Sequence, residues 1–373
     1  MNPANPLVQL AALGQSPWLD NITRDLLQTG ELRRLIAEAG LRGMTTNPTI
    51  FEKAVAGSDC YDADIRALAD SGVEARDIVE TLVVADVRAA CDLFLPLYHA
   101  SEGGDGFVSI EVSPELANNA DSTVREARRL WDAVDRPNVM IKIPGTQAGL
   151  PAITRCLTRG LNVNVTLLFS VARYRQVMEA HLAGLERRRA RREPINRVAS
   201  VASFFVSRVD TKLDPTLEHS GDAATRGLRG TIAIANALVA YEAFQETFRG
   251  PRWDALVREG ARVQRPLWAS TSTKDPAFPD VYYVEALVAP DTVNTLPPET
   301  FKAYGHHGRP EVRITKQTVA EAKQRLATLA GAGVDLEDAA RVLETEGVQK
   351  FSASFTALVN GVRQKAMALS GAS

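Results

Sequence analysis

An eightfold alternation of short apolar runs with longer amphipathic stretches constrains this chain most. The apolar spacing between the runs is helical, for example over residues 25–40 and 150–160. Repeated strand–helix alternation predicts α/β architecture, specifically a (β/α)8 TIM-type barrel. The eight strand-like runs are residues 16–20, 41–48, 106–113, 138–145, 161–169, 198–210, 265–273 and 290–297.

The length of the chain bears on its domain organisation. A doubly wound open sheet is the alternative to a barrel, but no GxGxxG turn follows the first run. The 373 residues exceed the roughly 250 of a typical barrel. We assign the excess to extended connections, chiefly after the second and sixth runs, and to a C-terminal helical tail over about residues 316–370. Without a repeat or a Pro/Ser linker, residues 1–373 are predicted to form a single domain.

Charge and targeting signals exclude several classes of partner. Lys and Arg number 43 against 45 Asp and Glu, so we expect no nucleic acid and no membrane partner. The basic run at residues 184–197 is interpreted as the solvated end of a helix.

Neither a secretory signal nor an apolar stretch of membrane-spanning length is visible. The odd, scattered cysteines Cys60, Cys91 and Cys156 favour a reducing compartment, so the predicted localisation is cytoplasmic.

Polar residues within apolar strands are the informative signal for function. Asn162, Asn164 and Thr166 alternate along one run and share a face, opposite Val163 and Val165. Because barrel strands face helices outward, this polar set is predicted to face the lumen. Buried amides and hydroxyls need hydrogen-bond partners, so a ligand near the carboxyl mouth explains them. An internally satisfied polar layer is the alternative.

Lys142 lies between Ile141 and Ile143, and is therefore predicted to point into the barrel. A buried ammonium is unfavourable unless it is paired or loses its proton. A neutral buried amine is the nucleophile that attacks a ketone. A structural lysine paired with Asp20 or Glu111 explains the position equally well, and these residues alone leave both interpretations open.

Further inward polar residues follow the other strands. Together they comprise two carboxylates, amides, hydroxyls and cations, which suit a phosphorylated polyol. No metal-ligand cluster is recognisable, since His306 and His307 lack a third ligand at a suitable spacing. We therefore favour covalent amine catalysis over Lewis-acid catalysis. The residues are Asp20, Asn47, Glu111, Ser203, Arg208, Ser270, Ser272 and Lys274, and Phe205 shares the face of Ser203.

Five motifs together resemble transaldolases, in particular their longer bacterial branch. They span nearly the whole predicted barrel in family order. The resemblance implies a Schiff-base transferase of the pentose phosphate pathway that needs no cofactor. It would move a dihydroxyacetone unit between ketose phosphates, such as sedoheptulose 7-phosphate and fructose 6-phosphate, and aldose phosphates. The motifs are residues 43–51, 138–146, 161–170, 201–210 and 267–276.

The same resemblance implies roles for the catalytic residues. Lys142 would form the Schiff base, and Asp20 would remove the proton of the C4 hydroxyl. Glu111, with Thr166, would act through a water during formation and breakdown of the Schiff base. Asn47 would hydrogen-bond the dihydroxyacetone unit.

Substrate-binding roles follow in the same way. Asn164 would help to hold the dihydroxyacetone unit, while Ser203, Arg208 and Ser270 would bind phosphate. The shorter branch of the family carries an arginine where this chain has Ser272. We expect Lys274, two residues further on the same face, to replace that charge.

Two alternatives remain beside a transaldolase. One is a Schiff-base aldolase that releases free dihydroxyacetone. Phe205 offers no hydrogen bond to the water that such release requires, which favours transfer. The other is a non-catalytic sugar-phosphate-binding barrel, which would not need a lumenal amine. The predicted partners are sugar phosphates, and the chain is expected to be a monomer or homodimer.

Overall fold

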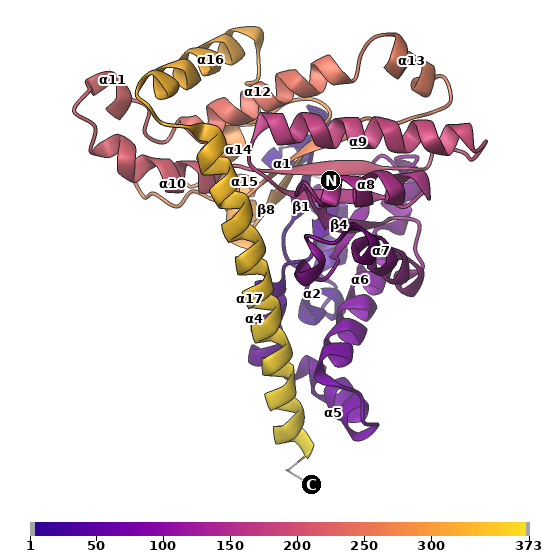
Figure 1. The fold of residues 1–373 in the computed structure, drawn as a ribbon. Coiled ribbons are helices and arrows are strands. Elements are labelled where there is room, and N and C mark those ends of the chain that lie inside the picture. Colours follow the sequence, from indigo (N-terminus) through magenta and orange to yellow (C-terminus); the bar gives the residue numbers. More distant parts are fainter. Residues whose placement is uncertain (1–3, 371–373) are drawn as a thin grey trace.

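A closed barrel of parallel strands forms the centre of the molecule (Figure 1). The computed structural model describes residues 4–370. Within these residues, eight strands are arranged in sequence order, and β1 pairs with β8 from Gln15↔Thr292 to Leu19↔Leu296 to close the ring. The predicted fold is confirmed, and each predicted run overlaps one strand. The strands are β1 Gln15–Leu19, β2 Gly43–Thr45, β3 Phe107–Glu111, β4 Val139–Pro144, β5 Val163–Leu168, β6 Ser200–Phe205, β7 Gln264–Ala269 and β8 Thr292–Leu296.

Helices surround the barrel and fill its longer connections, which follow β2 and β6 as expected. The helices up to β5 are α1 Pro6–Ala12, α2 Arg24–Gln28, α3 Glu31–Glu38, α4 Pro48–Gly57, η1 Asp59–Tyr61, α5 Asp62–Asp70, α6 Ala75–Ala100, η2 Pro114–Leu116, α7 Ala120–Val134 and α8 Gly149–Thr158. The later helices are α9 Val171–Ala190, α10 Ser207–Glu218, α11 Ala223–Arg226, α12 Ile232–Thr247, α13 Pro251–Val257, α14 Tyr282–Ala286, α15 Pro298–His307, α16 Lys316–Gly331 and α17 Leu336–Ser370.

Asn162 does not face the mouth of the barrel, contrary to the prediction for its run. Its amide nitrogen donates to the carbonyl oxygens of Pro137 and Val139, both at 3.0 Å, and its Oδ1 accepts from the backbone nitrogen of Ala199 at 2.9 Å. These partners lie at the amino ends of β4 and β6. Alternation along a strand predicts the face of a side chain but not its depth in the barrel. Asn162 therefore fits the alternative interpretation, in which a polar layer is satisfied by hydrogen bonds within the protein.

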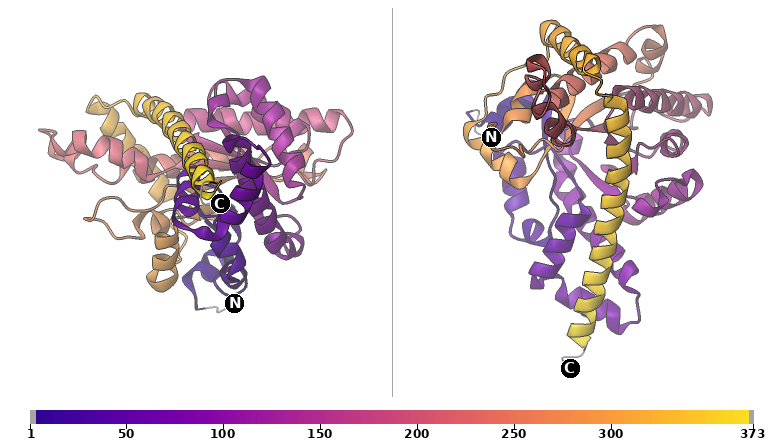
Figure 2. Two further views of the ribbon diagram at one scale, coloured as in Figure 1. Left: turned by 90° about the horizontal axis from the view of Figure 1, so that it is seen from below. Right: turned by 60° about the vertical axis from the view of Figure 1, so that its left-hand side comes forward.

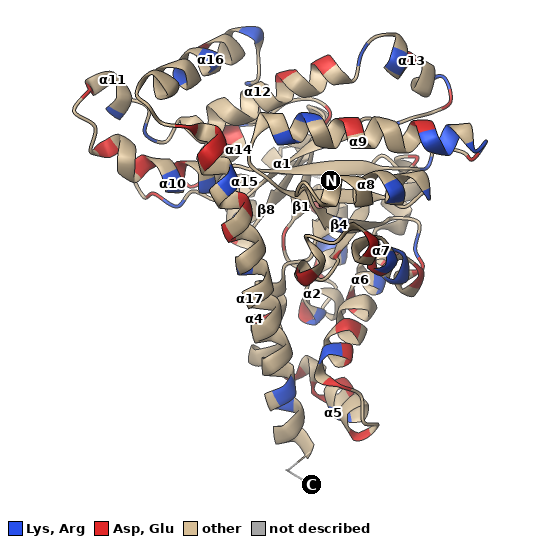
Figure 3. Ribbon diagram, viewed as in Figure 1, with Lys and Arg blue, Asp and Glu red and all other residues tan. Residues whose placement is uncertain are grey.

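The C-terminal tail is helical, as predicted, and ends in the 35-residue helix α17. This helix packs against α4, α5 and α6, which all belong to the first 100 residues of the chain (Figures 1 and 2). Its central stretch, residues 351–362, contains no charged residue, whereas charges flank it on both sides (Figure 3). Leu358 and Val362 from this stretch are buried in a hydrophobic cluster with side chains of α4, α5 and α6. An uncharged middle thus allows α17 to pack on the connection after β2.

Among residues 4–370, no helix is both long enough and apolar enough to cross a membrane.

Gly43 provides a test of packing inside the barrel. It is paired in register with Trp18, and a Cβ at Gly43 would lie 2.4 Å from Cε2 of that buried indole. We expect Gly43→Ala to destabilise the chain by about 1–3 kcal/mol, because the ring and the strand must shift. Gly57→Ala, whose added Cβ would meet nothing within 4 Å, is the matched control and should stay within about 0.5 kcal/mol of the parent. Urea unfolding midpoints measure both changes, and equal midpoints would contradict the packing argument.

Candidate active site

A cavity of about 520 Å³ opens at the carboxyl ends of the barrel strands. Side chains from β1, β2 and β4 to β8, or from the turns that follow them, form its wall together with residues of α4, α10, α15 and α17. Except for Glu111 and Asn164, the predicted site residues line this cavity: Asp20, Asn47, Lys142, Thr166, Ser203, Phe205, Arg208, Ser270 and Lys274.

Lys142 is the buried cation at the centre of the site, with 7% of its surface exposed. Its Nζ donates to Glu111 Oε1 at 2.5 Å and to the carbonyl oxygen of Thr46 at 3.2 Å. The strand register explains this arrangement. Lys142 is paired with Glu111 on β3 and with Asn164 on β5, so the three side chains start at one level of the barrel. Lys142 is thus paired with Glu111, as the interpretation as a structural lysine expects. Its side chain nevertheless lines a cavity, as the catalytic interpretation expects.

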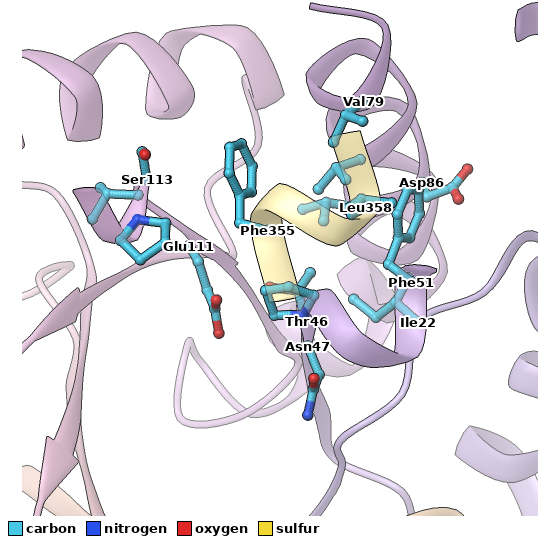
Figure 4. A pocket seen from close by; sticks show the side chains of 15 residues that line it. Ile22, Thr46, Asn47, Phe51, Val79, Asp86, Glu111, Ser113, Phe355 and Leu358 are labelled. Carbon is cyan, nitrogen blue, oxygen red and sulfur yellow. The ribbon is translucent and has the colours of Figure 1, made fainter. Parts of the chain in front are cut away.

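Glu111 lines a smaller apolar cavity of about 70 Å³ and contacts Lys142 of the main cavity. The smaller cavity is bounded by β3, α4, α6 and α17, and Figure 4 shows Phe355 and Leu358 of α17 among the residues that line it together with Glu111. Burial raises the pKa of the Glu111 carboxyl, while the neighbouring Lys142 opposes that shift. A carboxyl group in this environment binds a proton more readily than one in water.

Asp20 follows β1 and is oriented by the turn after β2. Its Oδ1 accepts from Thr45 Oγ1 at 2.6 Å, and its Oδ2 accepts from Asn47 Nδ2 at 3.2 Å. Asn47 caps helix α4, where its Oδ1 accepts from the backbone nitrogen of Thr49 at 3.1 Å. Since that bond engages the amide oxygen, the amide nitrogen is directed at the carboxylate. The cap therefore fixes the orientation of both side chains.

Asn164 starts at the same level as Lys142 but does not line the cavity. Its Nδ2 donates to Ser109 Oγ at 3.0 Å, and its Oδ1 accepts from Ser203 Oγ at 2.7 Å. Asn164 is fully buried, and its amide connects the hydroxyls of β3 and β6. Thr166 lines the cavity, and its buried Oγ1 has no hydrogen-bond partner within the described residues. This hydroxyl remains available to a molecule in the cavity.

The part of the mouth formed by the segments that follow β6 and β7 is cationic. The Arg208 guanidinium stacks on Phe205, with 4.9 Å from Cζ to the ring centroid, and among residues 4–370 it has no carboxylate partner. Burial lowers the pKa of Arg208, and the negative charge of Asp20 opposes that shift. A desolvated guanidinium without a counter-ion is suited to bind an anion.

Serines and a lysine complete this cationic side. Ser270 has a positive φ of 57° at the end of β7, and its Oγ lies 3.0 Å from Ser207 Oγ. Lys274 is exposed, and its Nζ donates to Ser272 Oγ at 2.7 Å. Lys274 and Arg208 line the same cavity, and the sequence analysis expected them on the same side of the mouth.

Lys53 of α4 and Phe351 of α17 are among the cavity residues that the sequence did not predict. Both belong to helices, and neither interrupts an apolar strand, so the signal used for the other residues was absent. In the part of the chain that the structure describes, no group of three His, Cys, Asp or Glu side chains is placed to hold a metal ion.

The closed barrel and the lysine-centred cavity at its carboxyl end define the class of (β/α)8-barrel enzymes. The family model described as transaldolase/fructose-6-phosphate aldolase matches residues 17–362. The transaldolase of Frankia alni is 49% identical over 362 residues, covering 97% of this chain and 98% of that protein. Those of Acidothermus cellulolyticus and Trichodesmium erythraeum are 51% and 44% identical, with 96% and 97% of both chains covered. This chain belongs to the transaldolase/fructose-6-phosphate aldolase family, as its motifs predicted.

Asp210 is a buried carboxyl group two residues after Arg208 in α10. Its Oδ1 accepts from the backbone nitrogen of Ala233 at 2.7 Å, and its Oδ2 accepts from the Tyr283 hydroxyl at 2.9 Å. Burial raises the pKa of Asp210 to about 7. Asp210 thus joins α10 to α12 and α14 through a carboxyl group that titrates near neutrality.

The shifted carboxyl predicts a pH dependence of stability. Between about pH 4 and pH 7 the folded chain holds a proton on Asp210 that the unfolded chain releases, so raising the pH lowers the free energy of unfolding. From pH 5 to pH 7.5 this contribution should amount to about 2 kcal/mol. Asp210→Asn, which stays neutral, should remove that part of the fall. Urea unfolding of both proteins at the two pH values measures the difference, and identical pH slopes would refute the assignment.

Proposed function

We propose that this chain is a transaldolase of the pentose phosphate pathway and that Lys142 carries the dihydroxyacetone unit as a Schiff base. The observation that carries the proposal is the buried Lys142 amine, held 2.5 Å from Glu111 at the floor of the cavity. Nucleophilic amine catalysis requires a lysine that can lose its proton inside a site. The family supports the reaction, and the geometry supports the assignment of residues to steps.

Formation of the Schiff base requires proton transfer to and from the amine. Burial raises the pKa of the Glu111 carboxyl, which lies within hydrogen-bond distance of the Lys142 amine and can take a proton from it. The neutral Lys142 amine then attacks C2 of a ketose phosphate. The carbinolamine loses water with a proton from Glu111, and the free hydroxyl of Thr166 can bind that water. The product is an iminium ion on Lys142.

Cleavage of the C3–C4 bond is assigned to Asp20. Its carboxylate takes the proton of the C4 hydroxyl, and the bond electrons move into the iminium, which becomes an enamine. An aldose leaves, and a second aldose accepts the enamine carbon while Asp20 returns the proton. Asn47 is held beside Asp20, so it can hydrogen-bond the same substrate. Asn164 orients Ser203.

The phosphate is assigned to the cationic side, where Arg208, Ser203, Ser270 and Lys274 meet the cavity. The substrates proposed are sedoheptulose 7-phosphate and fructose 6-phosphate as donors, and aldose phosphates as acceptors. We further propose that residues 1–373 act as one domain, as a monomer or homodimer, in the cytoplasm.

The Schiff base can be trapped directly. Borohydride together with fructose 6-phosphate should add mass to the peptide that contains Lys142. Lys142→Arg should abolish both adduct and turnover, because a guanidinium stays protonated and cannot attack. Lys53 lines the same cavity and is the control, so Lys53→Arg should still trap the sugar on Lys142. Peptide mass spectrometry reads out both.

Each remaining alternative has its own signature in this experiment. An adduct on another lysine would overturn the assignment of Lys142. Binding of fructose 6-phosphate without any adduct would instead indicate the non-catalytic sugar-phosphate-binding barrel. An adduct on Lys142, with free dihydroxyacetone as the main product of a parallel reaction without borohydride, would indicate the aldolase.

The phosphate side predicts a selective loss of affinity. A charged hydrogen bond contributes about 1.5–3 kcal/mol, so Arg208→Ala should lower kcat/KM for fructose 6-phosphate roughly ten- to hundredfold. The loss for unphosphorylated fructose should be much smaller. Lys274→Ala should show the same selectivity in milder form, because Lys274 is exposed. Steady-state kinetics with both sugars measures the ratio.

An unchanged preference for phosphate in Lys274→Ala would show that Arg208 and the serines hold the phosphate without it. Equal losses for both sugars in Arg208→Ala would place the phosphate elsewhere. Lys212→Ala is a matched control, since this lysine of the same helix α10 pairs with Glu346 instead of lining the cavity.

A further inference from the structure

The C-terminal helix α17 brings an aromatic ring to the proposed Schiff-base lysine. Phe351 lines the main cavity, and its ring centroid lies 5.7 Å from Lys142 Nζ. The ring is half-buried, and it approaches the amine over its face. Residue 351 follows the last barrel strand by more than fifty positions in the chain, so tertiary packing alone brings it there.

Several contacts hold this part of α17 in place. Gly347, one turn before Phe351, packs so closely on Leu167 that an added Cβ would lie 2.9 Å from Leu167 Cδ2. Ser354 Oγ lies 2.8 Å from Thr49 Oγ1 of α4. Further along, Lys365 Nζ donates to two backbone carbonyl oxygens at the end of α4, those of Val55 and Ser58. The ring is therefore carried by a helix that is anchored on both sides of it.

An aromatic face next to this amine has two physical consequences. It attracts a cation, whether the ammonium of the free enzyme or the iminium of the covalent adduct. It also occupies space beside Nζ with atoms that offer no strong hydrogen bond to water. Phe205, the other aromatic residue of the wall, instead stacks on Arg208. The two rings therefore cover different ends of the cavity.

We propose that Phe351 is a specificity-determining residue that favours transfer over release by restricting water at the Lys142 adduct. This inference rests on the proposed function. In release, the enamine carbon takes a proton, and water then adds to the iminium carbon. The carbinolamine expels the Lys142 amine, so that enamine and one water yield free amine and dihydroxyacetone. In transfer, the enamine carbon attacks an aldose before that water arrives.

The test measures partition between the two outcomes in the full-length enzyme. Fructose 6-phosphate and erythrose 4-phosphate are supplied, and the ratio of free dihydroxyacetone to sedoheptulose 7-phosphate is determined. We expect Phe351→Ala to raise this ratio roughly tenfold. Phe351→Leu, which keeps apolar bulk but removes the ring, should raise it less. Because the ratio compares two products of the same active molecules, a smaller folded fraction does not alter it.

Val362→Ala is the matched control, because this residue is fully buried in the packing of α17 but lines neither cavity. It should lower the unfolding midpoint and leave the product ratio unchanged. A ratio that stays at the parent value in Phe351→Ala, or that rises equally in Val362→Ala, would overturn the proposal. Borohydride trapping on the parent protein separates a failure of the role of Phe351 from a failure of the proposed function. An adduct on Lys142 with an unaltered ratio refutes only the role of Phe351, whereas absence of the adduct refutes the proposed function.

Discussion

The contact between Lys142 and Glu111 is the constraint on which the proposed chemistry depends. A charged pair taken out of water is costly unless its geometry and its remaining hydrogen bonds are good. Here the pair has one direct contact and one backbone carbonyl, and it borders a cavity instead of a sealed core. Such a pair contributes little to stability. Its value lies in a proton that two neighbouring groups can share, which amine catalysis needs and a hydrophobic pair cannot supply.

The register of the barrel is what makes this contact possible. The register of β3, β4 and β5 places Glu111, Lys142 and Asn164 side by side. The departures from regularity occur further up, at Leu167 and Ser270, which both have positive φ. Both lie next to cavity residues, where β5 and β7 end. Backbone strain at such positions is typical of functional sites.

Sequence reasoning predicted the barrel and most of the candidate site, because both depend on local patterns. Alternation of strand and helix defines the ring, and a polar residue within an apolar strand marks the lumen. Lys142 was recognisable on that basis, since two isoleucines flank it. Asn162 was misplaced because alternation specifies the face of a strand and not the level along the barrel. Phe351 and Lys53 could not be found this way, since apolar and charged residues are both ordinary in helices.

The helix that supplies Phe351 also reaches the proposed acid–base residue by a second route. Ser354 contacts the Thr49 hydroxyl, and the backbone nitrogen of Thr49 engages the Asn47 amide, whose nitrogen is directed at Asp20. The same helix therefore touches both the nucleophile and the cap that orients the carboxylate. The connection after β2 is long and needs a partner to bury its apolar face, and α17 provides that partner with an uncharged central stretch. Burial of the apolar face of this connection and approach to the Lys142 amine thus both require α17 to lie against α4. A helix that must lie against α4 to cover its apolar side chains necessarily passes the mouth of the barrel, where one aromatic residue reaches the amine.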